Sequence, residues 1–191
     1  MRTNFRLIVS MLIISIFMVV PVVEAQSGPQ QGASLTLPTV GVETSIVTAP
    51  LTSTTWDVSQ LGEQVGHLEG TSWLNTPGNI VLGGHSEDIY GNPAVFSALY
   101  DLELGDPVVM SENGVIRRYI VTEIQFVAFD DLRPIYPTTH EQVTLLTCAV
   151  GTFNQSINNY DERLVVIARP VPPLPAPIRE LFIDFGWLPE A

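Results

Sequence analysis

The sequence contains many short apolar runs, each ended by Gly, Pro, Asn or Asp. The clearest pair runs from Pro107 to Ser111 and from Val115 to Glu123, with Asn113-Gly114 between them. Asn-Gly between two alternating runs is the preferred type I′ hairpin turn. β-Branched and aromatic residues are plentiful in these runs and favour strands over helices. The pattern therefore predicts a mostly β protein.

Further runs of the same kind are predicted to be strands, namely Leu35 to Val40, Asn79 to Gly83, Ile124 to Phe129, Gln142 to Cys148 and Arg163 to Arg169. One short helix is predicted at Pro93 to Leu99, since proline suits the first turn of a helix. A chain of 191 residues, 46% of them hydrophobic, can bury one ordinary core. We therefore expect a single domain.

The N-terminal residues 1–25 read as an export segment. Arg2 and Arg6 precede an uncharged run from Leu7 to Val23, and Val23-Glu24-Ala25 has the small-residue spacing of a cleavage site. The run is slightly short of the roughly 20 residues that span a bilayer. A cleaved signal peptide and a membrane anchor both remain open. Either one places the rest of the chain outside the membrane, tethered there or secreted.

Both ends of the predicted domain have their own composition. Residues 26–34, rich in Gln, Gly and Ser, are predicted to be a flexible tether, and residues 35–170 the folded domain. Residues 171–191 begin with a proline-rich segment. Apolar residues then recur at helical spacing and predict a short amphipathic helix, through Ile178, Leu181, Phe182 and Phe185. We expect this helix to dock on the domain rather than to cover a substrate groove.

Charge excludes one large class of partner. The formal net charge is −12, which disfavours nucleic acid. Such a field attracts cationic groups, an amine-bearing acceptor among them, although acidity more often serves solubility. Oxygen-bearing side chains that Ca²⁺ could use are treated as scattered surface carboxylates, namely Glu87, Asp88, Asp101 and Glu103. No metal and no cofactor is predicted.

The chain contains one cysteine, Cys148, in a compartment where cysteines are normally paired. It is an inert buried residue, half of an intermolecular disulfide, or a nucleophile. The predicted strand from Gln142 ends at Cys148, and the next strand begins at Arg163 after a polar loop. If these strands are antiparallel neighbours, the thiol and the guanidinium share one sheet edge, with backbones about 5 Å apart.

A thiol with a pKa near 8.5 needs a base to react at neutral pH. His85 follows the predicted strand Asn79 to Gly83, and so emerges where a strand gives way to a loop. His67 and His140 are predicted to occupy ordinary turn or surface positions. Position alone favours His85 as the base.

Four segments carry a family resemblance. They are Thr144-Leu-Leu-Thr147-Cys148, Gly78-Asn-Ile-Val-Leu-Gly-Gly-His85, Arg163-Leu-Val-Val-Ile-Ala and Gly66-His-Leu-Glu-Gly-Thr71. In this order and spacing the chain resembles the sortases, the cell-surface cysteine transpeptidases of bacteria. The resemblance implies a single closed eight-stranded β-barrel with short helices. It also implies Cys148 as nucleophile, His85 as acid and base, and Arg163 as electrostatic stabiliser.

The resemblance extends to substrates. It implies cleavage of a short LPxTG-like sorting motif in secreted proteins, and an amine of the cell wall or of a pilin as acceptor. Thr147 is a candidate substrate-binding residue through its backbone, with side-chain packing an equally good account. The segment Leu37-Pro-Thr-Val-Gly41 only superficially matches such a motif and is read as the first barrel strand.

Two alternatives stay open. One is a different cell-wall cysteine acyl transferase such as an L,D-transpeptidase, although its Ser-His-Gly-x-Cys-like stretch is absent. The other is a membrane-tethered β module without activity. Retention of all three reactive side chains argues against this module.

Overall fold

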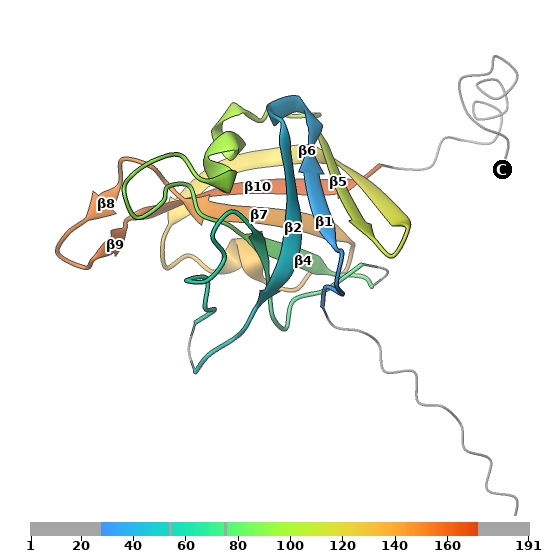
Figure 1. The fold of residues 1–191 in the computed structure, drawn as a ribbon, viewed down its shortest axis with the longest axis horizontal. Coiled ribbons are helices and arrows are strands. Elements are labelled where there is room, and N and C mark those ends of the chain that lie inside the picture. Colours follow the sequence, from blue (N-terminus) through green and yellow to red (C-terminus); the bar gives the residue numbers. More distant parts are fainter. Residues whose placement is uncertain (1–27, 54, 75, 172–191) are drawn as a thin grey trace, which may run out of the picture.

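Eight strands close into one barrel in the computed structural model, which describes residues 28–53, 55–74 and 76–171 (Figure 1). The order around the barrel is β1-β2-β3-β4-β7-β10-β6-β5. The strands are β1 (Ser34–Leu37), β2 (Val42–Ala49), β3 (Val65–Leu68), β4 (Asn79–Gly83), β5 (Pro107–Glu112), β6 (Val115–Ala128), β7 (Gln142–Cys148) and β10 (Glu162–Pro170). The predicted mostly β barrel is confirmed. The predicted export segment and C-terminal helix lie outside the described residues.

Short elements complete the fold. A two-stranded hairpin, β8 (Phe153–Asn154) and β9 (Asn159–Tyr160), stands in the loop between β7 and β10. The helices of the described part are 3₁₀ helices, η1 (Pro38–Val40), η2 (Val95–Asp101) and η3 (Arg133–Ile135). The helix predicted at Pro93 to Leu99 is thus η2, which starts later and is more tightly wound. Within the described ranges, no helix has the length and apolar character needed to cross a membrane.

The predicted hairpin at residues 107–123 is confirmed by β5 and β6. Glu112 pairs with Val115, and the residues between them, Asn113 and Gly114, have positive φ angles of 50° and 80°. Positive φ at both central positions is the signature of a type I′ turn. β6 then continues to Ala128, so the separate strand predicted at Ile124 to Phe129 is the second half of this one strand.

The first strands differ from their prediction. β1 ends at Leu37, because Pro38 has no N–H for the sheet and opens η1 instead. The segment Leu37 to Gly41 is therefore a strand only at its first residue. The prediction missed β2 and β3, since β2 buries only Ile46 and Ala49, and β3 is short.

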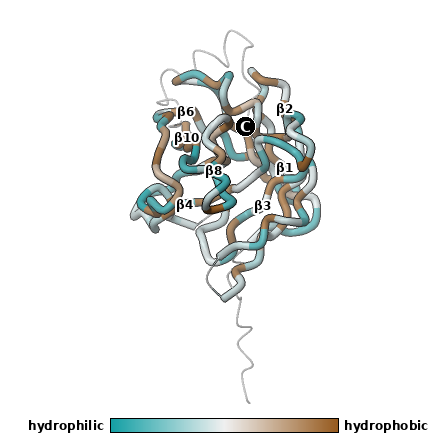
Figure 2. The backbone as a smooth tube through the Cα atoms, turned by 90° about the vertical axis from the view of Figure 1, so that its left-hand side faces the viewer, coloured by the Kyte–Doolittle hydropathy of each residue, from teal (hydrophilic) through white to brown (hydrophobic). Residues whose placement is uncertain are grey.

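Alternating side chains of the strands fill the barrel. Ile80 and Leu82 of β4 belong to the main core, together with Phe96 of η2 and Tyr119 of β6. Figure 2 shows hydrophobic and hydrophilic stretches alternating along the barrel wall. Val81, between Ile80 and Leu82, faces outward, because successive strand residues point to opposite faces.

A second small apolar cluster covers Val81 on this outer face. It contains Ala49 and Leu68, with Trp56, Val58 and Ile135 packed against them. The outer face of the barrel wall is therefore apolar at the middle of β4 and at the ends of β2 and β3.

Candidate active site

Cys148 and Arg163 are directly paired across two antiparallel strands. Cys148 is the last residue of β7, Arg163 is the second residue of β10, and the two are register partners. The antiparallel pairing expected from the sequence is thus observed. It places the thiol and the guanidinium at one edge of the barrel, beside the loop that connects their strands.

His85 reaches the same edge from β4. This strand runs parallel to β7, with Gly83 opposite Leu146, and the Gly84 N–H continues the pairing by donating to the Leu146 carbonyl. His85 follows at once. Its Nε2 lies 3.0 Å from the carbonyl oxygen of Val58. A carbonyl only accepts, so Nε2 carries the proton and Nδ1 is the nitrogen left to act as a base.

One pocket collects the three reactive side chains. It has a volume of about 200 Å³ and is lined by His85, Cys148 and Arg163, with Thr147 beside them. Trp56, Val58 and Leu68 form an apolar part of its wall. Three segments far apart in the chain therefore deliver sulfur, imidazole and guanidinium to a common cleft.

The Cys148 thiol is half-buried and free. Burial raises its pKa, the neighbouring Arg163 lowers it, and Glu87 raises it further. Burial is the largest of these effects, so the sulfur rests as a thiol at neutral pH. A nearby base is needed before it can attack, and His85 lines the same pocket.

Arg163 is fixed by three neutral oxygens. Its Nη1 donates to the carbonyls of Tyr160 and Glu162 at 3.0 and 3.1 Å, and its Nη2 donates to Asn159 Oδ1 at 2.9 Å. These bonds orient the guanidinium without cancelling its charge. A positive charge held in this way can stabilise an oxyanion in the pocket.

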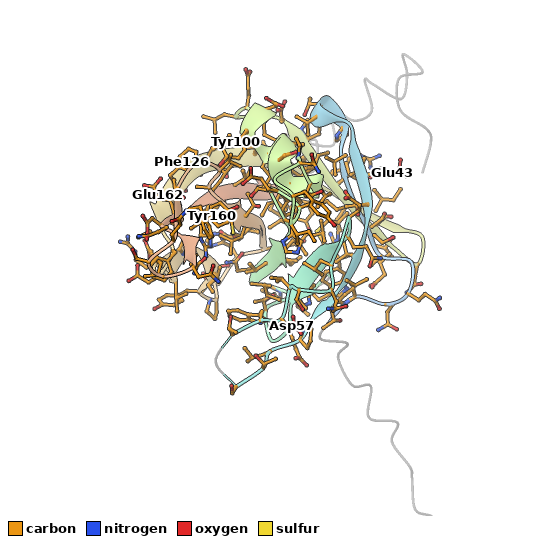
Figure 3. The ribbon with its side chains drawn as sticks, turned by 60° about the vertical axis from the view of Figure 1, so that its left-hand side comes forward. Glu43, Asp57, Tyr100, Phe126, Tyr160 and Glu162 are labelled. Atoms are coloured by element: carbon orange, nitrogen blue, oxygen red, sulfur yellow. The ribbon has the colours of Figure 1, made fainter. Side chains whose placement is uncertain are left out.

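The loop that holds Arg163 is itself tied to the segment after His85. The Tyr160 hydroxyl donates to Glu87 Oε2 at 2.9 Å, and the Val150 N–H donates to the Tyr100 hydroxyl at 2.6 Å. Figure 3 shows Tyr100 and Tyr160 on the same side of the barrel. Burial and the Glu87 carboxylate raise the pKa of Tyr160 to about 12, so its phenol stays protonated and keeps this bond.

Thr147 lines the pocket, but its hydroxyl is already engaged. It donates to the Gly84 carbonyl at 2.8 Å, and the residue is buried. The side chain therefore ties the end of β7 to the segment that carries His85.

Sequence reasoning missed Tyr160 and Val58 as neighbours of the site. Tyr160 lies in a polar loop where nothing in its surroundings distinguishes it. Val58 contributes only a backbone carbonyl, which any residue type could supply. From the sequence, Asn159 is one of several polar loop residues that could orient His85 or Arg163, although solvated loop polarity is the favoured interpretation, and Glu87 is expected to be a surface carboxylate.

The other two histidines differ in their burial. His140 is exposed, as predicted. The surface position predicted for His67 is wrong, because the residue lies in β3 and is fully buried, with its ring centroid 4.8 Å from that of Trp73. Its Nε2 lies 2.9 Å from the Ser72 carbonyl oxygen. His67 is therefore part of the packed interior.

Of the carboxylates considered for calcium, Asp88 accepts N–H groups of Tyr90 and Asn92 and so holds a turn. Among the described residues, no three His, Cys, Asp or Glu side chains gather as ligands for a metal ion.

Comparison with known proteins identifies the family to which this fold belongs. A family model described as a sortase domain matches residues 35–171. The structure is similar to sortase C-1 from Actinomyces oris, with 29% identity, a TM-score of 0.58 and 73% of each chain covered. It is also similar to sortase A from Corynebacterium diphtheriae, with 28% identity and a TM-score of 0.59, covering 75% of this chain and 62% of that one. A pilus-related sortase C of Group B Streptococcus has 25% identity and a TM-score of 0.58, with 74% and 67% covered. A comparison with curated proteins gave no match.

Proposed function

Because the chain belongs to the sortase family, we propose that it is a cysteine transpeptidase that cleaves an LPxTG-like sorting motif in secreted proteins and transfers the acyl group to a cell-surface amine. The observation that carries this proposal is the single pocket lined by His85, Cys148 and Arg163. Nucleophile, base and oxyanion stabiliser are the three parts that acyl transfer through a thiol requires.

The first half of the reaction forms a thioester. His85 takes the thiol proton at Nδ1, and the Cys148 sulfur attacks the carbonyl carbon of the scissile peptide bond. Arg163 stabilises the oxyanion with the positive charge of its guanidinium. Loss of one such donor commonly costs about 10²- to 10³-fold in rate. His85 then protonates the departing amine, and the acyl group remains on sulfur.

The second half reverses these roles. An incoming amine gives a proton to His85 and attacks the thioester carbonyl carbon. The carbon–sulfur bond breaks, and the Cys148 sulfur recovers its proton. The thioester thus divides one difficult exchange into two easier steps.

A neighbouring pocket suits the apolar part of a sorting motif. It has a volume of about 360 Å³, and Trp56 lines both this pocket and the catalytic one. Its remaining apolar wall comes from Leu51 and from the loop between β6 and β7, through Leu132, Ile135 and Tyr136. We assign to this pocket the leucine and proline that precede the scissile bond, because concave apolar surface rewards burial of such side chains.

The proposed place of action is the outer face of the cell membrane. The charge pattern of residues 1–25 supports export, with the chain either tethered by this segment or released after cleavage. The proposed partners are secreted proteins with a C-terminal sorting motif and an amine of the cell wall or of a pilin.

Mass spectrometry of a peptide reaction tests this function. The full chain is incubated with a peptide containing an LPxTG motif, with and without an added amine. We expect a product joined to the amine, and hydrolysed peptide when the amine is omitted. His85→Ala and Arg163→Ala are expected to abolish turnover with little change in the melting temperature. Intact peptide in every reaction would favour a β module without activity.

A further inference from the structure

Asn79, the first residue of β4, lines the pocket assigned above to the leucine and proline of the sorting motif. The residue is only 2% exposed, although its side chain ends in a polar carboxamide. Val81, two residues further along β4, faces outward from the barrel wall, so Asn79 faces the same way. A buried amide needs hydrogen-bond partners. The loop between β6 and β7 (residues 129–141) supplies them.

The carboxamide of Asn79 links the barrel wall to this loop. Its Nδ2 donates to the carbonyl of Pro134 at 2.8 Å and to that of Tyr136 at 3.1 Å. Its Oδ1 accepts the hydroxyl proton of Thr144 in β7 at 2.7 Å. Carbonyl oxygens only accept, so these contacts leave one orientation for the amide. Both hydrogens of Nδ2 thus bind the loop, while the oxygen is tied to the barrel.

The two carbonyl groups that Asn79 binds lie on either side of Ile135 in the chain. Ile135 lines the pocket and also packs against the apolar cluster around Val81. Leu132 and Tyr136 of the same loop line the pocket as well. The bonds from Asn79 therefore fix how far this loop stands from the barrel wall, and with that distance the width of the pocket.

Hydrogen bonds and apolar contacts hold a loop in different ways. Apolar contact is non-directional, so the packing of Ile135 alone would let the loop shift along the wall. The bonds to Asn79 have defined lengths and directions and favour one position. An apolar side chain at position 79 would avoid the cost of burying an amide. The amide is therefore better explained by the loop position that it imposes than by stability.

Asn79 is remote from the reacting atoms. It stands at the opposite end of β4 from His85, six residues away, which is about 20 Å along an extended chain. Its effect on the reaction therefore passes through the shape of the pocket and not through the thiol or the imidazole.

We propose that Asn79 is the positioning residue that makes this pocket selective for the leucine of the sorting motif. Its amide holds the loop close enough for loop and barrel wall to contact the leucine side chain on both sides. Thr144 supports this role by fixing the orientation of the amide. The inference rests on the proposed transpeptidase function and adds the group that sets its substrate selectivity.

Discrimination between two peptides tests this role. The full chain is supplied with an LPxTG peptide or with an APxTG peptide, in which alanine replaces the leucine and the scissile bond is unchanged. The readout is the ratio of kcat/KM for the two peptides. In Asn79→Ala we expect this ratio to fall about tenfold, since contact with a few methylene groups is worth at least that much. The fall should appear in the KM for the LPxTG peptide, with kcat little changed.

Matched variants separate selectivity from stability. Thr144→Val removes the hydroxyl that orients Asn79 and should lower the ratio several-fold, whereas Thr144→Ser keeps the hydroxyl and should retain the wild-type ratio. Val108→Ala shortens a buried side chain of β5 inside the barrel, and should lower the melting temperature without changing the ratio. A comparable fall of the ratio in Val108→Ala would show that selectivity follows overall stability, and would overturn the proposal.

Alkylation of Cys148 by iodoacetamide uses no sorting motif, so its rate should be the same in Asn79→Ala and in the wild type. A slower rate would place the effect at the reacting sulfur and would overturn the positioning role.

The remaining outcomes are also decisive. A wild-type ratio in Asn79→Ala would overturn the inference and leave the transpeptidase function intact. Failure of the wild-type chain to cleave either peptide would overturn both. If melting curves show that Asn79→Ala does not fold, an unchanged ratio in Thr144→Val overturns the inference in its place.

Discussion

Thr147 donates its hydroxyl proton to the carbonyl oxygen of Gly84 at a distance of 2.8 Å. This bond joins the residue before Cys148 to the residue before His85, so it couples the positions of the thiol and the imidazole. Gly84 lies just beyond the end of β4, where its N–H donates to the Leu146 carbonyl, and the Thr147 hydroxyl adds a second bond to β7 at this residue. The hydroxyl therefore gives Thr147 a positioning role, beside its place in the wall of the pocket.

Removal of the Thr147 hydroxyl should lower the rate of turnover and cost little free energy of unfolding. In Thr147→Val the Gly84 carbonyl loses its partner, and we expect a loss of about 1 kcal/mol in the free energy of unfolding. The kcat for peptide cleavage should fall about tenfold, because His85 is no longer held at a fixed distance from the sulfur. Thr147→Ser keeps the hydroxyl and should recover most of the kcat. Equal turnover in the valine and serine variants would contradict the role.

The hydrogen bond from Arg163 Nη2 to Asn159 Oδ1 gives a second test. Asn159→Ala removes the acceptor of Nη2 and leaves the two backbone acceptors of Nη1. We expect kcat to fall several-fold with little change in KM, because a mobile guanidinium stabilises the oxyanion less well. Asn154→Ala, in the same loop, is the control, since the Asn154 side chain bonds Asp161 and not Arg163. A matching loss of kcat in both variants would point to general disturbance of the loop.

Much of this site follows from local sequence, and the structure shows why the rest does not. The end of a strand at Cys148 and the start of another at Arg163 are visible in the apolar pattern, and antiparallel pairing makes them neighbours. The position of His85 follows from the strand before it. Tertiary contacts through Tyr160, Val58 and Gly84 carry no such pattern, because they join segments far apart in the chain.

The misread elements have equally local causes. Strand β2 buries only Ile46 and Ala49 and so lacks an apolar signal, whereas β3 is short and contains Gly66 and His67. A histidine between polar-looking neighbours resembles a turn residue until the barrel closes around it. In Leu37 to Gly41 the apolar residues favour a strand, but Pro38 lacks the N–H that a sheet would pair, so β1 ends before it.

The raised pKa of Cys148 predicts its reactivity. Burial favours the neutral thiol, so alkylation of the folded protein by iodoacetamide should speed up only as pH rises above the range where a free cysteine ionises. Arg163→Gln removes a cation that favours the thiolate and should move the profile to higher pH. Glu87→Gln removes an anion and should move it lower. These rates are measured by mass spectrometry across a pH series.

Labelling of Cys148 that begins only after denaturation would contradict this prediction. It would show that the sulfur is inaccessible in the folded state. Shifts of the same sign in the Arg163 and Glu87 variants would show that their charges do not act on the thiol.

Burial of His67 predicts that the free energy of unfolding falls in acid. Burial lowers its pKa in the folded state, and its Nδ1 is buried without a hydrogen-bond partner among the described residues. In the unfolded chain His67 binds a proton below about pH 6.5, whereas the folded protein resists doing so. The free energy of unfolding should therefore decline as pH falls below that value, and show no such cost above it.

Urea denaturation at several pH values measures this effect. His67→Gln should weaken the decline between neutral pH and the folded-state pKa, whatever its effect on stability at neutral pH. His140→Gln changes an exposed histidine and should keep the wild-type pH dependence. Identical slopes for His67→Gln and the wild type would show that His67 does not contribute.

Intact-protein mass spectrometry after brief exposure to an LPxTG peptide looks for the covalent intermediate on Cys148 itself. We expect a mass gain equal to the acyl part of the peptide, located on Cys148 by fragmentation and released by hydroxylamine. Cys148→Ala should show no gain, and His85→Ala a much slower one. Peptide cleavage that persists in Cys148→Ala, or an adduct on another residue, would contradict this mechanism.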